Sequence, residues 1–282
     1  MDTTAAPFRN YLFSIAYRML SSVQDAEDIL QDTYLVWLSK DQSMVENPKN
    51  YLAKTVVNRS IKLLEQRQKQ RANYFGTWLP EPLIQTNFEI EQTETISYSF
   101  LLLLEKLTPT ERAVFLLHEV FDWKYETIAE SFEFALANCR QLFHRAKNKI
   151  KSDKKRFQVN AKKREELTSI FMQVCKTGAI HELFEFLKEE VILYGDGGGK
   201  VLATVKPIFG KTKVMRFFKG VLPKMPKDVQ FVVKMVNNAP TIITYHGQTI
   251  INVLLMELND GGVANIYAVR NPDKLKHIDL LI

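Results

Sequence analysis

The chain has 282 residues, of which 46% are hydrophobic, and a formal net charge of +6, so we expect two or three domains with ordinary hydrophobic cores. Two cysteines, Cys139 and Cys175, exclude a disulfide framework and a cysteine-rich metal site. The sequence opens without a signal peptide and contains no apolar run of about 20 residues, which predicts a cytoplasmic protein.

The first third of the chain is predicted to be helical. Apolar residues at helical spacing indicate helices over residues 8–20, 25–38 and 50–71. The outer face of the second helix carries Asp25, Asp28, Gln31 and Asp32. Acidic residues in a first turn stabilise the helix dipole, which accounts for the earlier residues of this set but not for Asp32. We therefore interpret the face as a contact for a protein partner with a basic surface.

The third helix begins with polar and basic side chains. They are Lys49, Asn50, Lys54, Asn58 and Arg59. The helix dipole favours cations at the end of a helix, so it does not explain cations at this start. After this helix, Pro80 and Pro82 exclude a regular helix over residues 74–83. Trp78 and Leu79 make this stretch too apolar for a passive tether, and we expect it to pack against another part of the protein.

A helix-turn-helix is predicted next. Residues 96–107 are helical in pattern, and Thr108 and Glu111 form a capping box that opens a helix over residues 109–121. Helices over residues 124–132 and 135–149 follow, separated by a tight break. The last helix exposes groups suited to base edges and phosphates in a major groove, and we interpret it as a recognition helix. These groups are Asn138, Arg140, Gln141, Arg145 and Lys147.

The charge distribution agrees with DNA binding at two places. Residues 54–71 contain six Lys or Arg and one acidic residue, and residues 140–164 contain eleven and one. Residues 81–105 contain five Glu and no Lys or Arg. Charge needed only for solubility would be spread more evenly, so we infer two contacts with one polyanion.

The last part of the chain changes its periodicity. Residues 151–164 are polar and basic and are interpreted as a linker. Helices are expected over residues 165–176 and 180–190. Strands are expected over residues 191–194, 201–206, 229–236, 241–245, 250–258 and 263–269. The order predicts an α+β domain with two or three helices on a curved antiparallel sheet.

These segments carry a family resemblance. DAEDILQDTYLVWL, NYLAKTVVNRSIKLL and LTPTERAVFLLHEVFDWKYETIAESF resemble regions 2 and 4 of extracytoplasmic-function sigma factors. WLPEP (78–82), DGGGK (196–200) and NPDKL (271–275) resemble motifs of the subgroup with a fused SnoaL-like C-terminal domain. The implied domains are region 2 (1–73), a linker (74–94), region 4 (95–150), a basic linker (151–164) and an α+β SnoaL-like cone (165–282).

The resemblance implies roles for these residues. Asp25, Asp28, Gln31 and Asp32 match the surface that binds RNA polymerase core. Lys49, Asn50, Lys54, Asn58 and Arg59 match the −10 reader, which must offset the cost of flipping a base. Asn138, Arg140, Gln141, Arg145 and Lys147 match the −35 reader. The SnoaL-like domain is implied to replace a separate anti-sigma factor. Relatives usually have Gly and Ser or Thr where this chain has Glu133 and Ala135.

The three motifs form a predicted interdomain or regulatory set. It comprises Trp78, Leu79, Pro80, Glu81, Pro82, Asp196, Gly197, Gly198, Gly199, Lys200, Asn271, Pro272, Asp273, Lys274 and Leu275. DGGGK is either a flexible turn between strands or a loop that contacts a ligand or the sigma body. Our hypothesis is that the motifs lie near one another and hold the two DNA-binding halves at a set spacing.

Catalysis is not expected. His181, His246, His277 and Asp196 are the candidates in the last domain, but nothing spaces them as a dyad. We expect a non-enzyme without metal or cofactor: an alternative sigma factor controlled in cis, binding RNA polymerase core and promoter DNA and no membrane. A small-molecule ligand of the last domain stays open. The alternatives are a ligand-sensing helix-turn-helix regulator and a SnoaL-type cyclase or isomerase with a DNA-binding half.

Overall fold

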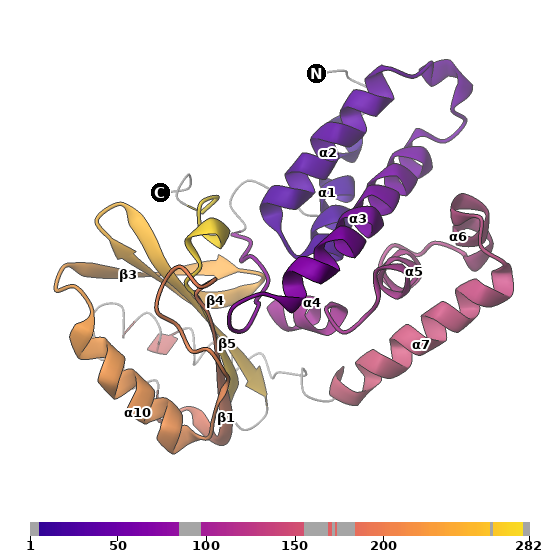
Figure 1. Ribbon diagram of the computed structural model, residues 1–282. Helices are drawn as coiled ribbons and strands as arrows, with labels where there is room; N and C mark the ends of the chain where they lie inside the picture. The colour runs from indigo at the N-terminus through magenta and orange to yellow at the C-terminus, as the bar shows by residue number, and fades with distance from the viewer. Residues whose placement is uncertain are drawn as a thin grey trace. The chain divides into compact units, whose positions relative to one another are not determined.

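The computed structural model describes residues 6–84, 97–154, 169–170, 173, 184–259 and 262–278. They belong to two compact units (Figure 1). The first unit contains described residues 6–72 and 100–153, and the second contains residues 73–84, 97–99 and the described remainder.

The first three helices of the first unit follow the sequence pattern. They are α1 (Arg9–Leu20), α2 (Val23–Leu38) and α3 (Pro48–Ala72), with short 3₁₀ turns η1 (Ala6–Phe8) and η2 (Gln42–Met44). Helix α2 begins two residues before the predicted start because Ser22 caps it, its hydroxyl accepting the amide of Asp25. Leu12, Leu52 and Val56 are fully buried between the helices, which confirms the apolar periodicity as the driving pattern.

Four further helices follow, and all of their residues except Tyr98, Ser99 and Lys154 belong to the first unit. They are α4 (Tyr98–Leu104), α5 (Pro109–Glu119), α6 (Tyr125–Phe132) and α7 (Leu136–Lys154). The predicted capping box is present: the Glu111 amide donates to the Thr108 hydroxyl, and the Thr108 amide donates to the Glu111 carboxylate. The predicted helices over residues 109–121, 124–132 and 135–149 are therefore confirmed.

A buried arginine joins the two groups of helices within the first unit. Arg112 of α5 is 2% exposed and donates to the Met19 carbonyl at 2.6 Å and to Glu105 Oε1 at 2.8 Å. The Ser21 hydroxyl donates to the same Glu105 oxygen at 2.8 Å. Burying a guanidinium is unfavourable without such partners, so this network fixes α5 against the end of α1.

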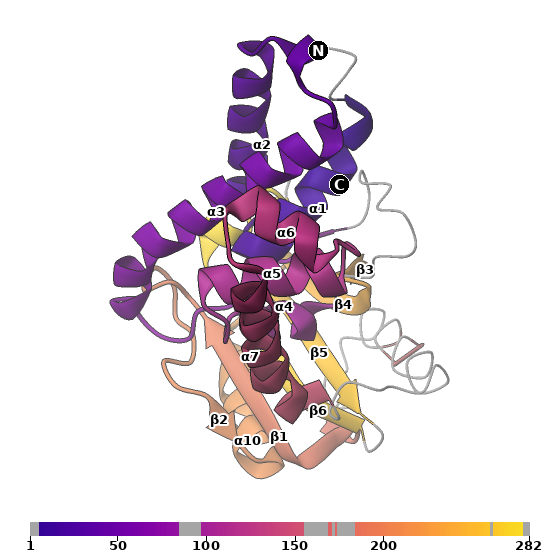
Figure 2. The same ribbon diagram turned by 90° about the vertical axis from the view of Figure 1, so that its right-hand side faces the viewer.

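The second unit is built on one six-stranded sheet. Its strands are β1 (Leu187–Asp196), β2 (Ile208–Phe209), β3 (Val229–Val236), β4 (Ala239–His246), β5 (Thr249–Asn259) and β6 (Gly262–Val269). The spatial order is β2-β1-β6-β5-β4-β3, and Figure 2 shows β1 between β2 and β6. Helix α10 (Lys211–Val221) packs on one face, where Val214 joins a core with Leu193 and Ile242. Short 3₁₀ turns η3 (Leu222–Lys224) and η4 (Pro272–Lys274) follow α10 and β6.

Several features of this unit differ from the sequence prediction, and the two-residue strand β2 is one that was not predicted. Residues 187–190 were predicted to be helical but form the start of β1, because Leu187 pairs with Val263 across the sheet. Residues 201–206 form no strand, and Leu202 is 82% exposed. Helix α10 was not predicted. Strands β1 and β6 are parallel, whereas the remaining pairs are antiparallel as expected. Nearly all of the predicted helix over residues 165–176 lies outside the described residues.

Candidate nucleic-acid interface and linker cluster

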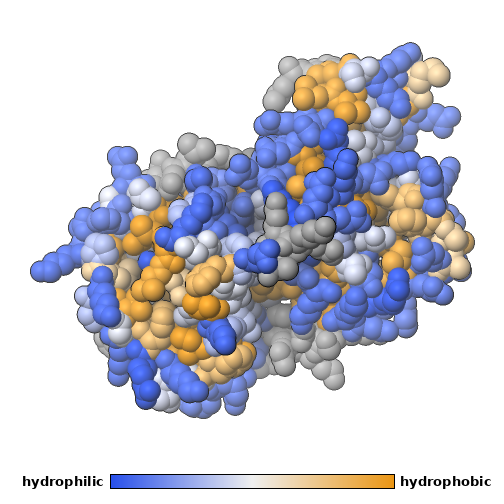
Figure 3. Space-filling model, in the orientation of Figure 1, coloured by the Kyte–Doolittle hydropathy of each residue, from blue (hydrophilic) through white to orange (hydrophobic). Residues whose placement is uncertain are grey.

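Helix α7 carries the predicted recognition residues on an exposed face. Asn138, Arg140, Gln141 and Arg145 are exposed and Lys147 is half-buried, while Cys139 on the opposite side is fully buried. Burial raises the pKa of the Cys139 thiol, which makes it a core residue rather than a nucleophile. Hydrophilic surface borders the region where Figure 1 places α7 (Figure 3). The structure thus brings the five residues together on one helix.

The turn before α7 has a backbone geometry that is less favourable for Glu133 and Ala135 than for the Gly and the Ser or Thr usual at these positions. Glu133 adopts the left-handed conformation with φ of 56°, which glycine adopts more easily. The Ala135 carbonyl accepts the amides of Asn138 and Cys139 at 2.9 and 3.1 Å, so Ala135 occupies the N-cap without a capping side chain. The turn therefore forms without the usual Gly and Ser or Thr.

The basic side chains of α7 face acidic neighbours. Lys147 lies 3.3 Å from Glu119, and Arg140 lies 3.8 Å from Glu126. Arg145 lies 3.7 Å from Glu111, whose side chain is 4% exposed. Ion pairs with an exposed partner contribute little to stability in water, so these pairs do little to hold the side chains of α7 in place.

The predicted −10 residues lie along the first half of α3. The Lys49 ammonium lies 4.1 Å from the centre of the Tyr11 ring. Asn58 is exposed, and Asn50 and Lys54 are half-buried. Arg59 donates to Asp32 of α2 at 2.7 Å, so a predicted DNA contact and a predicted polymerase contact form one ion pair.

The four predicted polymerase contacts on α2 differ in accessibility. Asp25 is 8% exposed, and its carboxylate binds Arg67 in a bidentate pair, with Nη2 to Oδ1 at 2.8 Å. Asp28, Gln31 and Asp32 are exposed. Asp25 therefore fixes α3 against α2, whereas the other three present polar groups to solvent.

Sequence reasoning missed an apolar surface beside these residues. Leu35, Leu38 and Met44 are 66%, 54% and 78% exposed at the end of α2 and in η2. Hydrophobic surface is visible at the top of Figure 3, where Figure 1 places this segment. Exposed apolar side chains next to an acidic face are typical of a protein-binding surface. The helical spacing of Leu35 from Asp28 and Asp32 was the available signal.

In the second unit, the three sequence motifs meet at Asp196. This residue ends β1 and is fully buried. Its Oδ2 accepts the Leu79 amide at 2.9 Å and the Lys274 ammonium at 2.7 Å. Its Oδ1 accepts the Tyr74 hydroxyl at 2.5 Å and the Gly198 amide at 3.0 Å. Burial and the adjacent Asp196 carboxylate raise the pKa of Tyr74, so the phenol stays protonated as the donor.

Lys274 and Asn271 complete this group. The Lys274 ammonium donates to the Leu79 carbonyl and lies 4.1 Å from the centre of the Trp78 ring. Asn271 donates its side-chain amide to the Tyr74 hydroxyl at 2.9 Å. We call Tyr74, Trp78, Leu79, Asp196, Asn271 and Lys274 the linker cluster. The cluster surrounds the buried ion pair between Asp196 and Lys274 with further hydrogen bonds. Such bonds offset the cost of removing the two charges from water.

Glycine is required where DGGGK passes the cluster. A Cβ at Gly198 would lie 2.3 Å from Asn271 Nδ2, and the Gly198 φ is +60°. Lys200 beyond it forms an ion pair with Asp273 of NPDKL, and this pair lowers the pKa of Asp273. The DGGGK segment thus forms a turn and also contacts other parts of the chain, namely NPDKL and the linker.

The linker is bound beyond WLPEP as well. The Leu83 amide donates to Asn237 Oδ1, and the Asn237 amide donates to the Leu83 carbonyl, both at 3.0 Å. The Tyr98 hydroxyl donates to the Pro80 carbonyl at 2.8 Å, and a His277 ring nitrogen lies 2.7 Å from the Pro82 carbonyl oxygen. The expected packing of this stretch is therefore present.

The catalytic candidates do not converge. His277 contacts the linker, and His246 lies on the surface 3.2 Å from Asp228. Asp196 is occupied by four hydrogen bonds, and His181 lies outside the described residues. Within the described ranges, no group of three His, Cys, Asp or Glu side chains is arranged to hold a metal. The helices of the described parts are too short or too polar to cross a membrane.

Two sequence families match the helical part of the chain. Sigma-70 region 2 matches residues 6–70, and sigma-70 region 4 matches residues 98–150. The three-helix group and the helix-turn-helix therefore define a sigma factor, a transcription initiation factor that is not an enzyme. As a sigma factor, the chain acts with RNA polymerase core and promoter DNA.

Full-length relatives narrow the class. The ECF RNA polymerase sigma factor SigJ of Mycobacterium tuberculosis is 27% identical over 284 residues, covering 94% of this chain and 90% of the relative. The probable ECF RNA polymerase sigma factor SigI of the same organism is 25% identical over 275 residues, covering 95% and 92%. The crystal structure of SigJ superposes with a TM-score of 0.76 at 26% identity, covering 96% of each chain. The two matched regions and the full-length similarity to SigJ support the resemblance to extracytoplasmic-function sigma factors, and the C-terminal six-stranded sheet with its helices matches the SigJ structure.

Proposed function

We propose that this protein is an alternative sigma factor whose C-terminal domain controls promoter-specific initiation in cis through the linker cluster. The observation that carries the proposal is that Asp196 accepts hydrogen bonds from Tyr74 and Leu79 of the linker and from Lys274 of NPDKL. Residues 74–84 lie between regions 2 and 4 in the sequence but are bound by the C-terminal domain. A change in that domain therefore acts on the segment that connects the two DNA-binding regions.

The geometry of the first unit supports a need for such control. Lys49, a proposed −10 contact, lies over Tyr11, and the Tyr11 hydroxyl accepts the Trp123 indole of region 4 at 3.0 Å. The positions −10 and −35 are numbered 25 base pairs apart, which is about 85 Å at 3.4 Å per base pair. Regions 2 and 4 must therefore separate before both elements are bound, and the packed unit is the form without DNA.

The linker sets how far the regions separate. It has 25 residues between the described ends of α3 and α4, residues 73–97. Within the eleven-residue stretch Tyr74–Ile84, contacts with the C-terminal domain are made by Tyr74, Leu79, Leu83 and Ile84. An extended chain of 25 residues spans at most about 85 Å. Binding eleven residues in place removes much of this reach and favours one spacing. We therefore expect release of the linker to change the rate of initiation.

The residue roles follow from exposure and charge. We propose that Asp28, Gln31 and Asp32, with the apolar Leu35 and Leu38, contact polymerase core, and that Asp25 supports them through Arg67. For the −10 element we propose Lys49, Asn50, Lys54, Asn58 and Arg59. For the −35 element we propose Asn138, Arg140, Gln141, Arg145 and Lys147.

Regulation by a small molecule is a second part of the proposal. It rests on a cavity in the C-terminal domain that is lined by both apolar and polar groups. The two alternatives from the sequence, a helix-turn-helix repressor and a SnoaL-type enzyme, are disfavoured by the region 2 match and by the catalytic candidates that do not converge.

The test is run-off transcription with purified polymerase core on a set of promoter fragments. The wild-type chain should produce promoter-specific transcripts, and Tyr74→Phe, which removes one hydroxyl from the linker cluster, should change the rate. Lys219→Met on α10 is the matched control because Lys219 is exposed and outside the cluster. Transcripts with equal rates from wild type and Tyr74→Phe would leave the sigma activity intact and exclude control through the cluster.

A further inference from the structure

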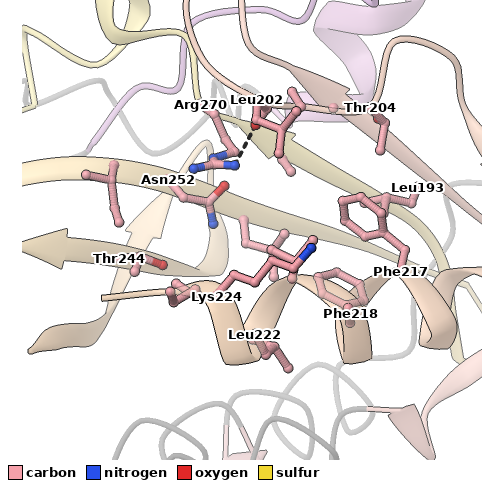
Figure 4. Close-up of a pocket in the computed structure, with 18 of the residues that line it drawn as sticks. Leu193, Leu202, Thr204, Phe217, Phe218, Leu222, Lys224, Thr244, Asn252 and Arg270 are labelled. Atoms are coloured by element: carbon pink, nitrogen blue, oxygen red, sulfur yellow. Dashed lines mark hydrogen bonds between the residues drawn. The ribbon is translucent and has the colours of Figure 1, made fainter. Parts of the chain in front are cut away.

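The C-terminal domain contains a cavity of about 280 Å³ between α10 and the sheet (Figure 4). Phe217, Phe218 and Leu222 line it from α10 and η3, and Leu193 and Leu254 line it from the sheet. The volume lies near the lower end of the range of about 300–1,000 Å³ found for small-molecule sites. The apolar walls suit a small hydrophobic body.

Two buried polar atoms of the lining have no hydrogen-bond partner in the structure. They are the side-chain oxygens of Thr204 and Asn252. An unpaired buried oxygen is unfavourable, and such groups in native proteins generally receive a partner. The amide oxygen of Asn252 only accepts hydrogen bonds, so the missing partner there is a hydroxyl or an N–H group.

A cation lies beside Asn252. Arg270 directly follows β6, and its guanidinium lies next to the Asn252 side chain in Figure 4. It donates one bond, from Nη1 to the Leu202 carbonyl at 2.5 Å, and burial lowers the pKa of Arg270. A guanidinium has five N–H donors, and no described carboxylate forms a salt bridge with this one. The remaining donors match a carboxylate in geometry and charge.

We propose that this cavity binds a small apolar carboxylic acid that carries a hydroxyl group close to its carboxylate. The carboxylate pairs with Arg270, the hydroxyl donates to Asn252, and the hydrocarbon part packs against Phe217, Phe218 and Leu254. The inference deepens the proposed function, on which it rests, by naming the class of molecule that the regulatory domain senses.

The ligand site is connected to the linker cluster through the backbone. The amides of Arg270 and Asn271 donate to the Asp196 carbonyl at 2.7 and 2.9 Å. On the other side of the cavity, a Cβ at Gly195 would lie 2.5 Å from Thr204 Oγ1, so the loop that carries Thr204 rests directly on β1. An acid that draws Arg270 inward therefore acts on the residues that hold Tyr74 and Leu79.

The test is isothermal titration of the full chain with three matched probes. They are 3-hydroxyoctanoate, octanoate and 1-octanol, which share a chain length and differ in the hydroxyl and the charge. We expect octanoate to bind about tenfold more tightly than 1-octanol, because a charge-assisted pair adds about that factor, and 3-hydroxyoctanoate to bind more tightly still. Equal binding of octanoate and 1-octanol, or tighter binding of the alcohol, would refute the proposal of a carboxylic acid and indicate a neutral ligand.

Variants locate the site. Arg270→Met should abolish the preference for the acid, and Arg270→Lys should retain part of it, which separates loss of charge from a disturbed loop. Asn252→Leu should remove the advantage of the hydroxy acid over octanoate. Arg216→Met on the exposed side of α10 is the control and should change nothing. Unchanged binding in both Arg270→Met and Asn252→Leu would place the acid elsewhere and refute the assignment.

Run-off transcription separates this inference from the proposed function. If the inference is correct, 3-hydroxyoctanoate changes the initiation rate of the wild type and leaves Arg270→Met unaffected. If Tyr74→Phe changes the rate while no acid is preferred by the protein, control through the linker stands and the ligand class is wrong. If an acid binds through Arg270 while Tyr74→Phe transcribes as wild type does, the site stands and its link to initiation is wrong.

Discussion

Replacing Asp196 with asparagine tests the linker cluster most severely. The substitution keeps the size of the side chain but removes the charge opposite Lys274, whose side chain is 8% exposed. It also replaces one of two accepting oxygens with an NH₂ group, although four donors point at this side chain. Removing one partner of a buried ion pair costs about 3–5 kcal/mol, and we expect a destabilisation of that order, confined to the cluster.

The rate of hydrogen exchange at the Leu79 amide measures this destabilisation at the linker cluster itself. The amide donates to Asp196 at 2.9 Å, so its exchange reports whether the linker is bound. A loss of about 3–5 kcal/mol corresponds to exchange that is faster by about 10²–10⁴-fold. The double variant Asp196→Asn with Lys274→Met should recover part of the protection of the Leu79 amide. The second substitution removes the buried Lys274 ammonium, which Asp196→Asn alone leaves without a counter-ion. Unchanged exchange at Leu79 in Asp196→Asn would refute the assigned role of the carboxylate.

Four further predictions concern the first unit. Glu133→Gly and Ala135→Ser should each stabilise the helix-turn-helix by about 1 kcal/mol, which thermal unfolding measures; a lower transition temperature would show that the turn geometry is misassigned. Arg112→Met should cost about 3 kcal/mol by leaving a buried carboxylate without its cation, and unchanged urea unfolding would contradict this. Lys147→Met should reduce the salt slope of promoter binding by about one, and an unchanged slope would remove Lys147 from the phosphate contacts. Burial raises the pKa of Glu111, but hydrogen bonds from Lys149 and the Thr108 backbone outweigh it and leave that pKa lowered. Its stabilisation is therefore present above the unfolded pKa of about 4.3 and lost as the pH falls through the lower folded value; Glu111→Gln should flatten this dependence in acid-unfolding curves, and identical curves would contradict it.

The helices were predictable because their signals are local. Capping residues, prolines and the 3.6-residue spacing of apolar side chains each act within a few positions, and Thr108 and Glu111 behave as their spacing predicts. Strands β3 to β6 are also local, since only two residues of sequence separate each strand from the next. The recognition face of α7 followed from the same periodicity.

The features that were not predicted depend on distant partners. The start of β1 has the sequence LKEE, which favours a helix, and becomes a strand only through pairing with β6. The sequence indicated that WLPEP, DGGGK and NPDKL belong together. It gave no sign that Asp196 is the acceptor for all three segments, because its partners lie 117 and 78 residues away. Asp25 likewise appeared as surface until Arg67, 42 residues later, was placed beside it.

The central claim is that the C-terminal domain controls initiation through the linker cluster. The most direct measurement is run-off transcription with polymerase core, comparing the wild type, Asp196→Asn and a chain that ends at Lys163. We predict promoter-specific transcripts from all three and a rate that changes in the same direction in the variant and in the shortened chain. Equal rates from all three, or opposite changes in the two altered chains, would contradict the claim.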